Sequence, residues 1–247
     1  MTQNSRPTAP KAWHAKRPFA SPGMIRRLAS TVMLVGIVAS IWGVAYDING
    51  ATQAKAEVAV AVHLRPERAL KVGGTTPAGT PGTVLVQDGP EGLGPFAFTI
   101  PAIPGDSVRL DGHGHTVTLR SWGSTVPEQL LNRGGFAVVG LCVGLGAVWL
   151  RRVLTSIAEG RPFQPGNAAR IAGMGALVAL ATLANDILPV IGGHLVLQRL
   201  GLIGPSSPIY VEVVPSLGLL LMVPFLLVLA EAFRRGAELA NELEGLV

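Results

Sequence analysis

The sequence predicts an α-helical membrane protein with four transmembrane helices and a small antiparallel β insert between helices one and two. Three observations lead to this fold class. Charged residues are only 14% of the 247-residue chain, against about 25% in ordinary globular domains, and the mean hydropathy is +0.44. Four apolar segments approach the roughly 20 residues that a helix needs to cross a hydrocarbon core. The stretch between the first two segments alternates apolar and polar residues, as strands do.

The predicted transmembrane helices are residues 28–46, 133–152, 171–193 and 212–231. The first contains no charged residue. A cleaved signal peptide is the alternative there, but the apolar run is longer than the usual 7–15 residues of such a signal. The second holds an uninterrupted apolar run with arginines at both ends. The third is apolar apart from Asn185 and Asp186, and the fourth contains Pro215 and Pro224.

The placement of lysine and arginine predicts the orientation, because cytoplasmic loops carry an excess of both. Basic residues are concentrated in the tail 1–27, which we expect to be disordered, around the loop 153–170, and in the tail 232–247. The link 194–211 carries only Arg199 and is predicted to be extracytoplasmic. The protein is therefore expected to be a multi-pass protein of a bacterial cytoplasmic membrane, with both termini in the cytoplasm.

Residues 47–132 are predicted to form an extracytoplasmic β-rich domain of four to six antiparallel strands. Strand-like runs, each set off by Gly or Pro, occupy residues 57–64, 83–86 and 96–100. The clearest hairpin joins residues 107–110 to residues 116–120, because Asp-Gly at the turn is a strong hairpin signal.

Histidines in this domain raise the hypothesis of a metal site. His113 and His115 lie on the predicted turn, and His63 lies on the first strand. A metal needs three or four converging ligands, and no cysteine or compact acidic cluster completes this set. Two solvated histidines on a turn are the favoured interpretation, so no metal or other cofactor is predicted. Cys142 is the only cysteine, which excludes a disulfide within the chain.

The third predicted helix carries the polar pair Asn185 and Asp186. An ionisable residue inside a membrane is costly and usually faces a partner or a water-filled path. One interpretation is a proton- or ion-binding group. The favoured one is a structural pair near the outer boundary, capped by water, by His194 or by Arg199.

Small residues in the second helix predict close helix packing. Gly140 and Gly144 stand four residues apart, a spacing that lets two helix backbones approach each other. Packing within the chain is the default interpretation, and homodimerisation is the alternative.

Two cytoplasmic segments follow the second and fourth helices. The first contains Gly160, Pro162 and Pro165, which end the preceding helix, and Asn167, which is predicted to N-cap the third helix. The tail 232–247 spaces its apolar residues as an amphipathic extension of the fourth helix, lying along the membrane surface or against a partner.

These two segments also resemble a known family. The loop reads G-x-P-F…N…R-I, and the final helix carries F-R-x-G…L…E…E-G-x-V. Over residues 134–247 the chain is similar to an uncharacterised family of bacterial four-span membrane proteins, the domain of unknown function 2975. The first helix and the β domain match that family in layout only. Its members are often encoded beside a small helix-turn-helix regulator, so the resemblance implies a membrane partner of such a regulator and assigns no chemistry.

The predicted function is a non-catalytic sensing or interaction module that links the outer β domain to a cytoplasmic partner such as a small transcriptional regulator. We expect no enzyme, because the sequence contains no P-loop, G-x-S-x-G or H-E-x-x-H motif. No direct nucleic-acid binding is expected, because the basic residues lie beside apolar runs. The alternative is a small ion or solute transporter or channel subunit that uses Asp186. The candidate partner-binding residues are Arg161, Pro162, Phe163, Asn167, Phe233, Arg234, Arg235 and Glu242.

Overall fold

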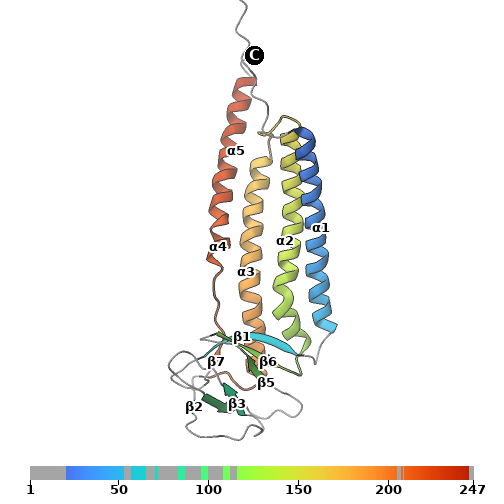
Figure 1. Ribbon diagram of the computed structural model, residues 1–247. Coiled ribbons are helices and arrows are strands. Elements are labelled where there is room, and N and C mark those ends of the chain that lie inside the picture. Colours follow the sequence, from blue (N-terminus) through green and yellow to red (C-terminus); the bar gives the residue numbers. More distant parts are fainter. Residues whose placement is uncertain are drawn as a thin grey trace, which may run out of the picture.

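Four long helices stand side by side in the computed structural model, and strands lie across one end of them (Figure 1). We call this end the sheet end. The opposite end, where α1 begins, α2 turns into α3 and α5 finishes, is the loop end. The structure describes residues 21–52, 57–64, 70–71, 83–86, 96–99, 108–111, 116–204, 207 and 209–244.

The helices follow one another across the molecule in chain order. They are α1 (Pro22–Thr52), α2 (Val126–Ala158), α3 (Asn167–Arg199), the short α4 (Leu217–Leu220) and α5 (Met222–Glu244). The long helices pack as neighbours, α1 on α2, α2 on α3 and α3 on α5. In the described part of the chain, four helical segments are long and apolar enough to cross a membrane. This confirms the number of such helices that the sequence predicts.

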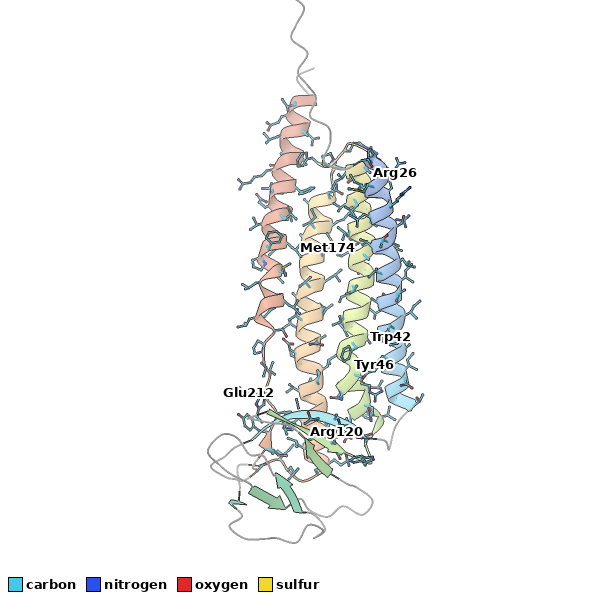
Figure 2. The ribbon with its side chains drawn as sticks, viewed as in Figure 1. Arg26, Trp42, Tyr46, Arg120, Met174 and Glu212 are labelled. Carbon is cyan, nitrogen blue, oxygen red and sulfur yellow. The ribbon has the colours of Figure 1, made fainter. Side chains whose placement is uncertain are left out.

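Large apolar side chains are exposed along the outer helices. On α1, Ile41 is 65% exposed and Trp42, labelled in Figure 2, is 73% exposed. On α5, Phe225 is 61% exposed and Val228 is 71% exposed. Water-soluble monomers rarely leave large contiguous apolar patches uncovered. By length and composition, the helices that carry these side chains could therefore cross a membrane.

α2 begins earlier than its apolar run. Residues 126–132, predicted to belong to the β domain, form the first turns of this helix. The backbone N–H of Thr125 donates to Glu128 Oε2 at 3.0 Å, which is half of a capping box and stabilises the start of a helix. The Thr-x-x-Glu spacing is visible in the sequence, but hydropathy alone places the boundary between the β domain and this helix at the start of the apolar run. α1 likewise extends beyond residues 28–46 at both ends.

The fourth predicted span is interrupted. Residues 212–216 are not helical, and α4 is separated from α5 by a turn at Leu221. Pro224 has no N–H to donate to the carbonyl of Leu220 one turn earlier, which explains the break. α5 then continues without interruption to Glu244, so the predicted amphipathic tail is part of the same helix.

Glycines let α1 and α2 approach closely. A Cβ built on Gly140 would lie 2.6 Å from the carbonyl oxygen of Ala39 and 3.2 Å from Cα of Gly43. Ser40 Oγ donates to the Gly140 carbonyl at 3.0 Å, and Gly144 also lies against Ser40. The predicted small-residue contact therefore lies within the chain, between α1 and α2.

The strands form two antiparallel sheets at the sheet end. They are β1 (Val58–Leu64), β2 (Leu70–Lys71), β3 (Thr83–Val86), β4 (Phe96–Thr99), β5 (Val108–Asp111), β6 (Thr116–Ser121) and β7 (Ile209–Tyr210). One sheet has the order β5-β6-β1-β7 and the other β2-β4-β3. The predicted hairpin is confirmed, since β5 pairs with β6 in the register Leu110 to Leu119. Strand β7 was not predicted; it comes from the link after α3 and pairs with β1.

The first sheet rests directly on the helices. Val58, Val60 and Val62 on one face of β1 are almost fully buried, as the two-residue period of a half-buried strand requires. A Cβ on Gly193 of α3 would lie 2.6 Å from Val60 Cγ1. The absence of a side chain at Gly193 therefore allows the sheet to pack against α3.

We predict that Gly140→Ala will destabilise the protein by about 1–3 kcal/mol, because the added methyl group forces α1 away from α2. The measurement is unfolding in detergent followed by tryptophan fluorescence. Gly146→Ala is the matched control, since its nearest neighbour, Leu177 Cδ1, would lie 3.9 Å from the new Cβ. Equal stability of the two variants would contradict the close-packing argument.

Candidate functional site

The sheet end and the helices are joined by a buried ion pair. Arg199, the last residue of α3, donates from Nε to Glu128 Oε1 at 3.0 Å. The side chain of Arg199 is 18% exposed and that of Glu128 is 3% exposed. The guanidinium also donates to Ser121 Oγ at 2.9 Å and to the Trp122 carbonyl at 3.4 Å. One side chain thus links α3 to the start of α2 and the end of β6.

Amides on α2 bind the backbone of β1 and the residue before it. Gln129 is fully buried, and its Nε2 donates to the Glu57 carbonyl at 3.1 Å and to Ser124 Oγ at 2.8 Å. Asn132 Nδ2 donates to the Ala59 carbonyl at 3.1 Å. We refer to these groups, with Arg199, Glu128, Ser121 and Trp122, as the sheet junction. Because these hydrogen bonds join the strands to both helices, the sheet cannot shift without breaking bonds to α2 or α3.

The loop end brings two predicted partner-binding residues into contact. The rings of Phe163, in the loop between α2 and α3, and Phe233, on α5, have centroids 5.7 Å apart. A Cβ on Gly236 would lie 2.5 Å from the Phe163 ring, so this glycine provides the space that the ring occupies. Phe163 is still 44% exposed. Phe233 packs inward against the buried Val153, Ile171 and Ala230.

Asn167 holds the loop behind this aromatic contact. Its side chain is fully buried, and Nδ2 donates to Ser156 Oγ at 2.7 Å and to the Pro162 carbonyl at 2.9 Å. Oδ1 accepts from Arg170 at 2.8 Å. The predicted N-cap role is wrong: the N-cap of α3 is Gly166, whose φ of 96° suits a glycine, and the Asn167 side chain turns back into the loop. We refer to Phe163, Phe233, Gly236, Asn167 and Ser156 as the loop-end cluster.

The other predicted partner-binding residues are exposed charges. Arg161 pairs with Glu159 at 2.6 Å. Arg234 and Arg235 on α5 both pair with Glu231, at 2.7 and 2.8 Å. Exposed pairs of this kind contribute little stability. Glu242 is exposed further along α5, near its end. These charges therefore surround the loop-end cluster without forming part of its packing.

Asp186 has a partner that the sequence did not suggest. Its Oδ2 accepts the backbone N–H of Ser216 at 2.9 Å, and its Oδ1 accepts the Ser216 hydroxyl at 2.8 Å. Asn185 lies beside it at 3.5 Å. Ser216 is the residue before α4, so the carboxylate ties α3 to the chain that leads into α4. Arg199, one of the expected capping partners, binds Glu128 instead.

The histidines of the metal hypothesis are only partly described. His113 and His115 lie outside the described residues. The ring of His63 on β1 lies 5.5 Å from the ring of Tyr210 on β7, measured between centroids. His63 therefore takes part in the contact between these two strands.

Several site residues carried a readable sequence signal and several did not. Glu128 is the last residue of the Thr-x-x-Glu capping motif. Gln129 is a single polar residue with no periodic or motif signal. The partnership of Ser216 with Asp186 joins residues 30 positions apart, and the contact of Gly236 with Phe163 also crosses elements. Such pairs depend on how α3 and α5 pack together.

The fold and these two ends define a class: a helical protein with four helices able to cross a membrane and a small β region at one end. No protein-family model matches the chain, and no curated protein or solved structure matches it. The resemblance of residues 134–247 to the four-span family stays a prediction.

We predict that Arg199→Ala will lower the free energy of unfolding by about 3–5 kcal/mol, because the nearly buried Glu128 would lose its partner. The matched control is Arg161→Ala at an exposed pair, where we expect a loss of about 1 kcal/mol or less. Both are measured by unfolding in detergent. Similar losses in the two variants would show that the sheet junction is not a buried electrostatic contact.

We also predict that Asp186→Ala will destabilise the protein by about 1–3 kcal/mol, because the N–H and hydroxyl of Ser216 lose their acceptor. Asp186→Asn should cost less, since the amide oxygen can still accept a hydrogen bond. Asn185→Ala, at the neighbouring position, is the control and should change stability by less than about 0.5 kcal/mol. An Asp186→Ala variant that is as stable as the wild type would argue against this structural role.

Proposed function

We propose that this protein is a non-catalytic integral membrane protein of a bacterial cytoplasmic membrane. Its β region binds an extracytoplasmic ligand or partner, and its loop end binds a cytoplasmic protein such as a small transcriptional regulator. The regulator is suggested as the partner because of the resemblance to the four-span family.

The exposed apolar surface of the helices supports the membrane location. The orientation rests on the arginines near the loop end, because basic residues are retained on the cytoplasmic side. These residues are Arg26, Arg27, Arg151, Arg152, Arg161, Arg170, Arg234 and Arg235. With this orientation the two sheets face the outside and the loop-end cluster faces the cytoplasm.

The observation that carries the proposal is that both ends are built on the same two helices. The sheet junction attaches the strands to the start of α2 and the end of α3. The loop-end cluster is built on the end of α2, the start of α3 and the facing part of α5. Each of the two helices has 33 residues, which corresponds to about 50 Å of rise. A force on the sheet can therefore act on the loop end through two continuous helices.

Transport through Asp186 has less support. Both carboxylate oxygens already accept hydrogen bonds from Ser216, and a relay needs a group that is free to exchange partners. Transporters also usually place ion sites within repeated halves, and the sequence shows no internal repeat.

The loop end supplies the test. We predict that a cytoplasmic protein co-purifies with the wild-type chain in detergent and that Phe163→Ala lowers its recovery about tenfold, which corresponds to the roughly 1.4 kcal/mol expected for losing one aromatic anchor. Deleting the residues after Phe233 should abolish recovery. Recovery is measured by quantitative mass spectrometry of cross-linked membranes.

The control is Phe225→Ala, because Phe225 is an exposed phenylalanine on α5, the helix that carries Phe233, but lies within the apolar span. Its recovery should match that of the wild type. If every protein recovered with the wild type is recovered equally with Phe163→Ala and with the truncated chain, the loop end is not a partner site.

A further inference from the structure

An apolar cavity lies among the helices on the loop-end half of the molecule. Its volume is about 650 Å³, within the range of about 300–1,000 Å³ that is typical of ligand pockets. All four long helices line it, including Val35 on α1, Gly146 on α2, Met174 on α3 and Phe233 on α5. Figure 2 labels Met174, which places the cavity in the half of the molecule away from the strands. Its walls are almost entirely apolar, so its occupant must be apolar too.

The arrangement of the helices leaves this cavity accessible from the side. The packed pairs are α1 with α2, α2 with α3, and α3 with α5, so α1 and α5 are the two ends of a row. Both nevertheless line the same cavity, which means that the row curves around it. In the membrane location proposed above, the substance that surrounds the open side is lipid, and the apolar part of a lipid is an acyl chain.

Two arginines lie one helical turn beyond residues that line the cavity at its loop end. Arg27 lies one helical turn before Thr31, whose hydroxyl donates to the Arg27 carbonyl at 3.1 Å and which lines the cavity. Arg170 lies one turn before Met174 on α3 and bonds the neutral amide of Asn167. Residues four apart share a helix face, so Arg27 and Arg170 lie on the same faces as the lining residues Thr31 and Met174.

In the part of the chain that the structure describes, Arg27 and Arg170 form no ion pair with a carboxylate, whereas Arg161, Arg234 and Arg235 all do. An apolar cavity with cations near one end matches an amphiphile that has an acyl chain and an anionic head.

We infer that this cavity binds an acyl chain of an anionic phospholipid, whose phosphate group lies at Arg27 and Arg170. The inference rests on the membrane location in the proposed function, but not on the existence of a cytoplasmic partner. It assigns a ligand of defined chemistry to the concave side of the helix row. Phe233 lines this cavity and also belongs to the loop-end cluster, so the lipid site and the partner site share one side chain.

The test is native mass spectrometry of the full chain after reconstitution in vesicles of equal parts phosphatidylglycerol and phosphatidylcholine. The wild type should retain more phosphatidylglycerol than phosphatidylcholine. Arg27→Gln and Arg170→Gln should each reduce retained phosphatidylglycerol about fivefold, since each removes a direct contact to the phosphate that contributes about 1 kcal/mol. Arg26→Gln is the control. Arg26 is at the same end of α1, but it precedes Arg27 by one residue and therefore lies on a different face of the helix from Thr31.

A second pair of variants tests the cavity itself. Gly146→Leu places a side chain inside it and should remove bound lipid of both kinds, since the nearest atom to the new Cβ is Leu177 Cδ1 at 3.9 Å. Gly218→Leu on α4 is the control, because no atom lies within 4 Å of its Cβ. Should Gly146→Leu fail to fold, Ala181→Leu on α3 fills the same cavity.

Three results would overturn the inference. Equal retention of the two lipids by the wild type would exclude recognition of an anionic head. Unchanged lipid retention in the folded cavity-filling variants would place the lipid elsewhere. A lipid-free dimer that Gly146→Leu dissociates would show that a second copy of the chain occupies the cavity. None of these measurements involves the cytoplasmic partner, so failure here is separable from failure of the partner experiment.

Discussion

Apolar side chains cover the outer helices where a water-soluble protein would carry charge, and the rest of the structure is arranged around this constraint. Trp42 on α1 and Val228 on α5 are each more than 70% exposed. An α-helix satisfies its backbone hydrogen bonds within one segment, so four apolar helices of this length could cross a membrane. Among the described residues, the strands lie at one end of the helices, and polar contacts lie at both ends and also between α3 and the chain before α4, where Asp186 meets Ser216.

The two ends of the molecule are held together by different kinds of contact. At the sheet end, a buried ion pair and side-chain amides bind strand backbone to helix, with Arg199 and Gln129 at the centre. At the loop end, an asparagine fixes a short loop and two aromatic rings meet over a glycine. Polar contacts are strongest where they are removed from water, and each end contains a fully buried amide, Gln129 in the sheet junction and Asn167 in the loop-end cluster. The loop-end cluster leaves one aromatic ring half-exposed, as a surface that meets another protein often does.

Local patterns account for the parts of the fold that were predicted. The four apolar runs and the Asp-Gly hairpin each depend on neighbouring residues, so helix number and strand pairing of β5 with β6 could be read directly. The start of α2 could also be predicted from Thr125 and Glu128. Hydropathy alone placed the start of this helix seven residues later, at Arg133. Among the candidate site residues, Phe163 and Phe233 lie in contact with each other, although nothing in their spacing indicated that they touch. Asn167 was recognised as important and assigned the wrong role, because its partners Ser156 and Pro162 come from the preceding turn rather than from the helix it begins.

The sequence by itself determined how many helices can cross a membrane, which stretches are strand-like and where basic residues gather. These are properties of composition and short-range periodicity, and they hold whatever the helices pack against. Only the tertiary structure decided that Asp186 meets Ser216, that β7 joins the sheet of β1, and that α1 and α5 curve around one cavity. Each of these depends on contacts between elements distant in the chain, and such contacts are set by the shapes and polar groups that packing brings together.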